Sequence, residues 1–227
     1  MAKKAKKLAK YSDLQEQLGN ELPINAARLK FIVLLITALI KVQSVNFERL
    51  AQGFDNEVKL SSNLRRIQRF FAEFDLSSDL IAQLLFKLLP FCGPYRLTLD
   101  RTNWKYGQTN INILVLGVIY KGLSLPILWT FLGDKRGNSD KHIEFLIVAS
   151  YTKTDEALSV YRQRWQIETM FKAFKTTGFN LEDTHLTDYQ RLDKLLMLKY
   201  LAFIWAYKQA FIEIKILKKL TSKNMAD

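Results

Sequence analysis

The sequence predicts an α/β protein, in which an all-helical region over residues 1–90 is followed by a mixed region over residues 91–227. Up to residue 89, apolar residues recur at helical spacing, between residues that cap or end helices. From residue 112 the pattern changes to two continuous apolar runs, residues 112–120 and 123–132. Lys121 and Gly122 join these runs, which predicts a hairpin of two buried strands.

The first region is expected to form a small helical bundle. Asn25 is the expected N-cap of a helix that extends to Lys41, and a short helix after it is expected to end at Gly53. Ser61 or Ser62 is the expected cap of the next helix. The most apolar stretch lies within the first of these helices and is shorter than the about 20 residues that span a bilayer, so we interpret it as a buried core helix.

Three arginines, Arg65, Arg66 and Arg69, lie off the apolar stripe of the helix after Ser62. This helix and the short one before it are typical of a helix-turn-helix or a similar bundle. In such a bundle the arginines would bind DNA phosphates or enter a groove. The alternative is that they form only a basic face exposed to solvent.

The composition favours a polyanionic partner. The chain has 227 residues, a formal net charge of +12 and a pI of about 9.7. Nucleic acid is the first candidate for such a partner, and an acidic membrane surface is the second. The basic start, MAKKAKKLAK, has no long apolar core or cleavage site, so no signal peptide is expected. A single cysteine, Cys92, excludes an internal disulfide and fits a cytosolic protein.

The strand before the hairpin ends in an acidic residue, Asp100. Residues 96–99 lead into Asp100 and, together with the hairpin, predict a three-strand antiparallel meander. The stretch FLIVA, residues 145–149, predicts one further buried strand. An aspartate at a strand end is often only a turn or capping residue, and its place before a hairpin is what favours a functional role.

Residues 161–175, YRQRWQIETMFKAFK, predict a helix with two different faces. Tyr161 is followed at offsets of three, seven and fourteen positions by Arg164, Glu168 and Lys175. At about 100° per residue, all four side chains fall within roughly 60° of one another on an ideal helix. The adjoining sector is apolar, so the helix is expected to bury one face and present a polar row beside it.

The polar row has two interpretations. In the first, it is a solvated helix face, where Arg164 and Glu168 form an ordinary ion pair. In the second, it is a phosphodiester site, where Glu168 binds a divalent metal while Arg164 and Lys175 bind phosphates. Tyr161 would then pack beside these groups, and Trp165 would stack on an unpaired base.

The spacing Y-x2-R-x3-E-x6-K and the surrounding IETMFKAFKTTGFNLEDTH resemble DDE transposases of the insertion-sequence-four type. The resemblance implies an RNase H-like core and two-metal cleavage and joining of DNA, with Mg²⁺ or Mn²⁺ as the cofactor. The stretch TLDRTNWKYG resembles the first-aspartate motif of that family. Asp100 and Glu168 are therefore the implied catalytic residues and metal ligands, and Tyr161, Arg164 and Lys175 are implied to handle DNA ends.

The family pattern breaks between the meander and the Glu168 helix. A DDE site needs three carboxylates to clamp two metals about 3.5–4 Å apart. The strand with the second aspartate should lie between residues 132 and 145, but only a polar loop is found there, with Asp134 and Asp140 as its acids. We interpret this as an internal deletion with its junction near residues 140–146, which leaves the RNase H-like core incomplete.

Taken together, these patterns predict a helical DNA-binding domain over residues 1–90 and a truncated transposase catalytic domain over residues 91–227. The expected function is transposition of an insertion sequence, impaired by loss of the second aspartate. The alternative is a catalytically dead remnant that only binds DNA or regulates. The expected partners are transposon ends and target DNA, with a homo-oligomer or a mixed oligomer with full-length transposase. The expected location is the cytoplasm, at the nucleoid, and not a membrane.

Overall fold

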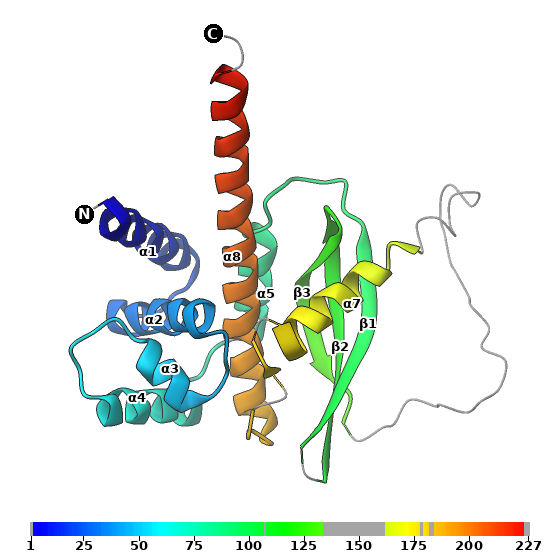
Figure 1. The fold of residues 1–227 in the computed structure, drawn as a ribbon. Coiled ribbons are helices and arrows are strands. Elements are labelled where there is room, and N and C mark those ends of the chain that lie inside the picture. The colour runs from blue at the N-terminus through cyan, green and yellow to red at the C-terminus, as the bar shows by residue number, and fades with distance from the viewer. Residues whose placement is uncertain (1, 107, 134–161, 178, 182–183, 225–227) are drawn as a thin grey trace, which may run out of the picture.

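The structure is a computed structural model that describes residues 2–106, 108–133, 162–177, 179–181 and 184–224 (Figure 1). Tyr161, the strand predicted at residues 145–149 and the deletion junction predicted near residues 140–146 lie outside these residues. The described part mixes α-helices with one three-stranded antiparallel sheet, in agreement with the predicted α/β class.

Five helices make up the N-terminal region: α1 (Ala2–Glu21), α2 (Ala26–Val42), α3 (Phe47–Gly53), α4 (Leu60–Glu73) and α5 (Ser78–Lys87). The predicted cap of α2 is confirmed, since the Asn25 side chain accepts a hydrogen bond from the Arg28 N–H at 2.9 Å. Asn46 caps α3 in the same way, accepting from two backbone N–H groups. Each cap satisfies donors that a helix start leaves without intrahelical partners.

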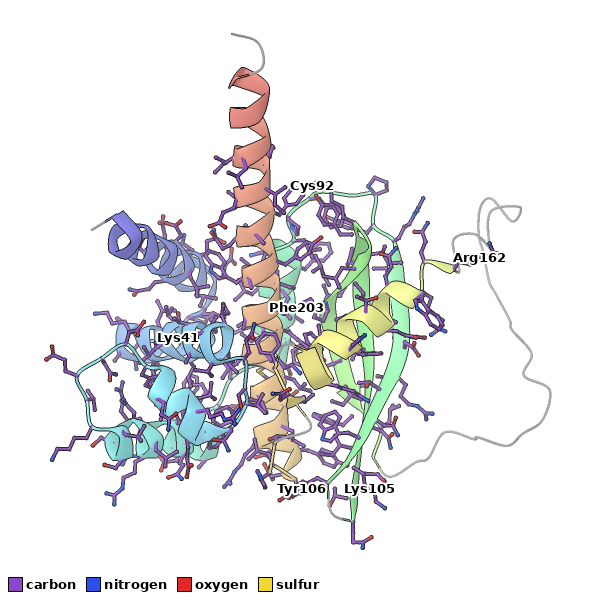
Figure 2. All side chains as sticks on the ribbon, in the orientation of Figure 1. Lys41, Cys92, Lys105, Tyr106, Arg162 and Phe203 are labelled. Carbon is purple, nitrogen blue, oxygen red and sulfur yellow. The ribbon has the colours of Figure 1, made fainter. Side chains whose placement is uncertain are left out.

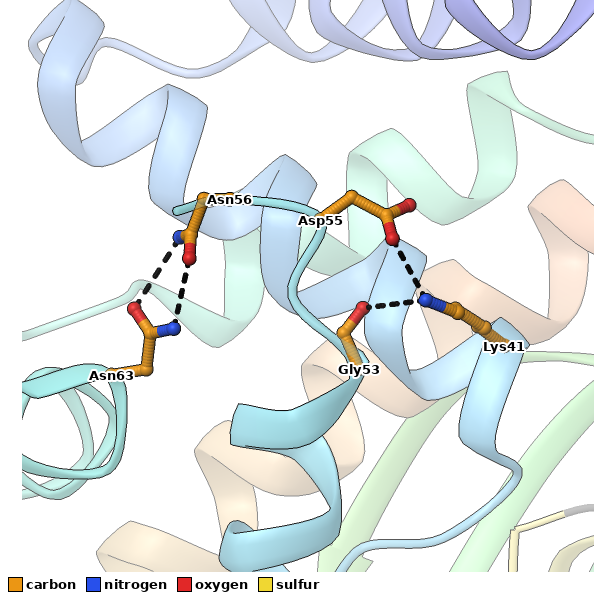
Figure 3. A network of polar contacts seen from close by, with 5 residues as sticks. All are labelled: Lys41, Gly53, Asp55, Asn56 and Asn63. Carbon is orange, nitrogen blue, oxygen red and sulfur yellow. Dashed lines mark hydrogen bonds and ion pairs between the residues drawn. The ribbon is translucent and has the colours of Figure 1, made fainter. Parts of the chain in front are cut away.

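The start of α4 differs from the prediction. Neither Ser61 nor Ser62 caps this helix, because it begins at Leu60 and its cap position, Lys59, makes no side-chain capping bond. The turn before α4 is instead fixed by the buried Asn63, whose amide exchanges hydrogen bonds of 2.9 and 3.3 Å with the Asn56 amide (Figure 3). A buried amide pair therefore orients α4, where a serine cap was expected.

The α2–α3 junction is held by close packing and by one lysine. Helix α3 ends at Gly53, as predicted, and a Cβ at this position would lie 2.7 Å from the Val42 side chain. Gly53 thus allows α3 to approach α2 closely. Lys41 also reaches across the junction to the Gly53 carbonyl at 3.4 Å and to the Asp55 carboxylate at 2.8 Å (Figure 3).

The core of the N-terminal region is built on α2, which confirms that its apolar stretch is a buried core helix. Phe31 of this helix contacts both Phe54 and Phe70, with ring centroids 5.8 and 5.5 Å apart. Phe70 in turn contacts Phe71 and Phe74. Tilted and edge-on ring pairs of this kind add stability beyond the burial of their area.

The predicted meander is confirmed. Its strands are β1 (Leu97–Tyr106), β2 (Thr109–Tyr120) and β3 (Leu123–Phe131), and their order in the sheet is β1-β2-β3. The β2–β3 turn is at Lys121 and Gly122, with φ values of 49° and 85°. Two positive φ values suit the right-handed twist of a tight hairpin. Strand β1 is consequently an edge of the described sheet.

The two faces of the sheet are unequally covered. The side chains of Arg96 and Asp100 contact the segment that carries helix α7 (Trp165–Lys172). Leu97 and Leu99 alternate with these residues and so belong to the opposite face, where they are 59% and 55% exposed. Across the strands, Leu99 pairs with Leu116 and Leu116 with Leu128, itself 47% exposed. A row of leucines on this face therefore meets solvent.

The helix predicted over residues 161–175 is not one continuous α-helix. Helix α7 ends at Lys172 and continues as the π-helix η2 (Ala173–Thr177). A π-helix has more residues per turn than an α-helix. The side chain of Lys175 therefore does not leave the helix in the direction that an ideal α-helix predicts. The apolar stripe is confirmed, because Ile167, Met170 and Phe174 are buried.

Helix α8 (Tyr189–Asn224) connects the N-terminal helices with the sheet (Figure 1). It packs against α2, α4, α5 and β3. Lys194 donates to the Phe71 carbonyl of α4 at 2.7 Å, and Trp129 of β3 donates to Asp193 at 2.5 Å. Helix α8 therefore packs against both the N-terminal helices and the sheet and holds the two together.

By length and composition alone, one helix in the described part of the chain is able to cross a membrane, namely Tyr189–Leu217 within α8. Of its most apolar window, 56% is buried inside the protein, as in the core helix of a globular protein. Helices α2 and α3 pass the same test only as a single span bent by 101°.

Candidate functional site

The carboxylates of Asp100 and Glu168 meet at one guanidinium group. Asp100 projects from β1 and accepts a hydrogen bond at Oδ2 from Nη1 of Arg164. Nη2 of the same arginine lies 3.6 Å from Oε1 of Glu168, one helical turn further along α7. All three side chains are partly buried. The two acids, separated by 68 positions in the sequence (168 − 100), therefore lie on either side of a single cation.

Three polar contacts fix the segment around α7 against β1. The Arg96 guanidinium donates to the Gln163 side chain at 2.8 Å, the Asp100–Arg164 pair follows, and Lys175 Nζ donates to the Asn103 carbonyl at 2.6 Å. In Figure 2, Arg162 lies at the start of this segment, and Lys105 and Tyr106 lie at the far end of β1. The segment thus crosses the sheet obliquely and brings three of its polar residues to one strand.

This arrangement can hold a positive charge between two carboxylates. The guanidinium of Arg164 occupies that position and is the cation that neutralises both acids in this structure. Oxygen ligands of this kind suit a hard divalent cation such as Mg²⁺ or Mn²⁺. Among the residues that the structure describes, no group of three or more acidic, histidine or cysteine residues converges on such a position.

Residues 89–205 match the family of the transposase DDE domain, and the matched segment covers more than half of the chain. The chain belongs to this family. The match includes β1 with Asp100 and α7 with Glu168, the two elements that meet at Arg164. No curated protein and no solved structure matches the chain.

Membership of the family gives the two-carboxylate arrangement a chemical context. DDE transposases act on DNA and generally use divalent metals. A cation position between an aspartate on a strand and a glutamate on a helix is compatible with that chemistry. The assignment of Asp100 and Glu168 as catalytic residues stays a prediction, as do the DNA-binding roles of Arg164, Lys175 and Trp165.

Trp165 is the most exposed aromatic residue beside the carboxylates. Its side chain is next to Arg164 at the start of α7 and is 66% exposed. Tryptophan is enriched at interfaces, where its ring offers a large apolar surface and its N–H a polar contact. The position is compatible with the predicted stacking on an unpaired base.

A second basic site lies in the N-terminal region. Arg28 of α2 and Arg66 and Arg69 of α4 line a hollow of about 200 Å³ with an aromatic floor. The guanidinium carbon of Arg28 lies 4.6 Å from the ring centroid of Phe74, and that of Arg66 lies 4.8 Å from the centroid of Phe31. Stacking on rings holds both guanidinium groups in fixed positions. Of the three predicted arginines, Arg66 and Arg69 share this hollow and Arg65, also exposed, does not line it.

Sequence reasoning missed two basic residues: Arg28, which lines the hollow, and Lys199, which contacts the π-helix η2. Arg28 was not predicted as a functional residue, because it lies at the start of a helix that was interpreted only from its apolar stretch. Lys199 was missed as well, although a single lysine within the apolar stretch LLMLKYLAF was a usable signal. Lys199 is fully buried, and burial, followed by the charge of Lys175, lowers its pKa well below the usual lysine value.

Proposed function

We propose that this chain is a DDE transposase of the insertion-sequence-four type whose catalytic centre is built on Asp100 and Glu168. The observation that carries the proposal is the convergence of both carboxylates on the guanidinium of Arg164. Two acids far apart in sequence are costly to bring together without a cation between them, since like charges repel. Their proximity therefore supports a site made to bind a cation.

Asp100 and Glu168 would hold Mg²⁺ or Mn²⁺, which in this chemistry activates the attacking oxygen and stabilises the leaving oxygen of the DNA backbone. The contribution of the chain itself is positional. Strand β1 and helix α7 hold the two carboxylates at fixed orientations, and the Arg96–Gln163 and Lys175–Asn103 hydrogen bonds keep the helix against the strand. Arg164 neutralises both acids until a phosphate competes for its guanidinium.

DNA would contact the chain at two places. Near the carboxylates, Tyr161, Arg164 and Lys175 would bind the DNA ends, and Trp165 would stack on an unpaired base. In the N-terminal region, Arg65, Arg66 and Arg69 would bind phosphates, with Arg28 in the same hollow as the last two. The net charge of +12 supports a large electrostatic share in this binding.

Cleavage and strand transfer would be impaired, because the second aspartate of the family is missing. Residues 133–144 lie between the last meander strand and the strand predicted at residues 145–149. This segment has too few residues to hold a helix, the second-aspartate strand and a second helix, because one crossover alone needs about a dozen residues. We infer that an internal deletion near residues 140–146 removed the second-aspartate strand, and that the RNase H-like core is therefore incomplete.

A catalytically dead remnant is the second candidate function. It would bind DNA at the nucleoid, or join a mixed oligomer with full-length transposase and act as a regulator. This candidate is favoured because no third acid joins Asp100 and Glu168 among the described residues, and because the basic hollow does not depend on a metal site.

The test compares nicking of supercoiled plasmid DNA in Mg²⁺ and in Mn²⁺ with binding of the same DNA across a salt series. We expect binding that weakens steeply as salt rises, with weak or no nicking, and we expect D100N and E168Q to remove any nicking that is present. Full cleavage activity would contradict the inferred impairment. A flat salt response would contradict the electrostatic DNA binding on which the transposase and the DNA-binding remnant both depend.

A further inference from the structure

The side chain of Lys199 on α8 donates a hydrogen bond to one backbone carbonyl. The residue is fully buried, and its Nζ donates to the Phe174 carbonyl at 3.1 Å. The same nitrogen lies 4.3 Å from the ring centroid of Phe174 and 5.7 Å from that of Phe179. A buried amine among rings is tolerated only with a hydrogen-bond acceptor. The Phe174 carbonyl is the acceptor that the fold supplies.

That carbonyl belongs to the peptide unit that joins Phe174 to Lys175. It lies in the π-helix η2, a rare conformation that interrupts the regular helix ladder and is frequent at functional sites. A peptide unit is planar, so fixing its carbonyl also fixes the direction in which the following residue leaves it. Lys199 therefore acts on the backbone at the point where the side chain of Lys175 begins.

The side chain of Lys175 extends from this point to β1. Its Nζ donates to the Asn103 carbonyl at 2.6 Å, three positions beyond Asp100 on the same strand. A continuous chain of contacts thus runs from α8 through η2 to the strand that carries the first carboxylate. The buried end of this chain is Lys199, and its other end is the ammonium group of Lys175.

We propose that Lys199 is a positioning residue, which holds the Phe174–Lys175 peptide so that the Lys175 ammonium stays against β1 and can bind a DNA phosphate. The proposal rests on the proposed function, because the phosphate contact of Lys175 is part of it. Burial, followed by the charge of Lys175, lowers the pKa of Lys199 and so favours its neutral amine, a form that still donates to the carbonyl.

The experiment uses the full chain and four variants: K175M, K199M, K175M/K199M and K194M. Lys194 is a matched control, because it is also buried on α8 and also donates to a phenylalanine carbonyl, that of Phe71. Binding of a fluorescent double-stranded oligonucleotide is measured by anisotropy at low salt. Exchange of backbone hydrogens over residues 173–177 is followed by mass spectrometry.

We expect K175M to weaken binding by roughly tenfold, as for one lost phosphate contact. K199M should weaken it by a similar factor, and the double variant should bind no more weakly than K175M alone. K199M should also speed hydrogen exchange over residues 173–177. K194M should lower thermal stability and leave both measurements unchanged.

The outcomes distinguish the positioning role of Lys199 from the DNA-binding role of Lys175. Loss of binding in K175M with none in K199M overturns the positioning role and leaves the proposed function standing. No loss in K175M overturns its role in DNA binding, and unchanged exchange in K199M overturns the positioning role in either case. If K199M and the shorter donor variant K199Q both fail to fold while K194M folds, Lys199 is purely structural and the proposal is overturned.

Discussion

Phe71 on α4 and Leu99 on β1 are both large apolar residues within regular elements, yet Phe71 is 1% exposed and Leu99 is 55% exposed. Around Phe71, the N-terminal helices and α8 close a core in which aromatic rings contact one another. Around Leu99, the described residues cover the sheet face that carries Asp100 and leave Leu97, Leu99 and Leu128 exposed on the other. Among the described residues, the N-terminal region therefore buries its large apolar side chains, whereas the sheet leaves those on one face exposed.

The difference lies in which other elements of the chain cover the apolar residues of each region. The N-terminal helices close their core with α8, which also supports the sheet. The sheet needs a further layer to cover Leu97, Leu99 and Leu128, as exposed apolar patches of this kind usually have a partner. Such an imbalance is expected if a DDE domain lost an internal segment while its helical region stayed intact.

The largest effect is expected from truncating one apolar residue in each region. Phe71→Ala should lower the free energy of unfolding by about 3–5 kcal/mol, because it leaves a cavity in a closed core. Leu99→Ala should change it by less than about 0.5 kcal/mol, because the side chain already meets water. Chemical denaturation of both variants measures the difference. Equal losses would show that the open sheet face is covered in solution.

The next effect concerns DNA binding by the N-terminal region. R28Q/R66Q/R69Q should lower the slope of log affinity against log salt by about three, which at 0.15 M salt corresponds to roughly a hundredfold weaker binding. R49Q removes an exposed arginine of α3 outside the hollow and is the control. A triple variant that behaves like R49Q would mean that the hollow is only a solvated basic face.

The smallest effect is a pH dependence of stability carried by Lys199. Its pKa in the folded protein is lowered by burial and then by Lys175, so between that lowered value and about 10.4 the unfolded chain holds a proton that the folded protein lacks. Stability should therefore rise with pH through this interval. Above pH about 10 the trend should reverse, because burial raises the pKa of the Tyr200 hydroxyl.

Comparing the wild type with K199M isolates this contribution, since Tyr200 is present in both. The free energy of unfolding, measured by denaturant titration from neutral pH to about pH 10, should rise more steeply in the wild type than in K199M. Parallel pH profiles would show that Lys199 keeps an ordinary pKa in the folded protein.

The sequence was most informative where local chemistry decides the structure. Asn25 and Gly53 predicted helix ends because capping and close helix approach depend on few neighbours, and the Lys121–Gly122 hairpin needed only its turn and two apolar runs. The spacing of Arg164 and Glu168 likewise predicted their pairing. The convergence of Asp100 on the same guanidinium rested on the resemblance to a family, since periodicity does not pair distant elements.

Other features depend on packing that no local pattern encodes. The π-helix η2 changes the phase of Lys175, and it is held by a contact with Lys199 on a distant helix. The turn before α4 is fixed by the Asn56–Asn63 amide pair, so the serine cap predicted there was wrong. In both cases a buried polar group found a partner outside its own helix, which overrides the local preference.

The most direct test of the central claim is the affinity for Mn²⁺, followed by electron paramagnetic resonance in the absence of DNA. If Asp100 and Glu168 form one cation site held by Arg164, R164Q should bind Mn²⁺ at least tenfold more tightly than the wild type, and R162Q should match the wild type. Adding D100N or E168Q to R164Q should remove the gain. Unchanged affinity in R164Q, or a gain that survives loss of either acid, would contradict a shared cation site.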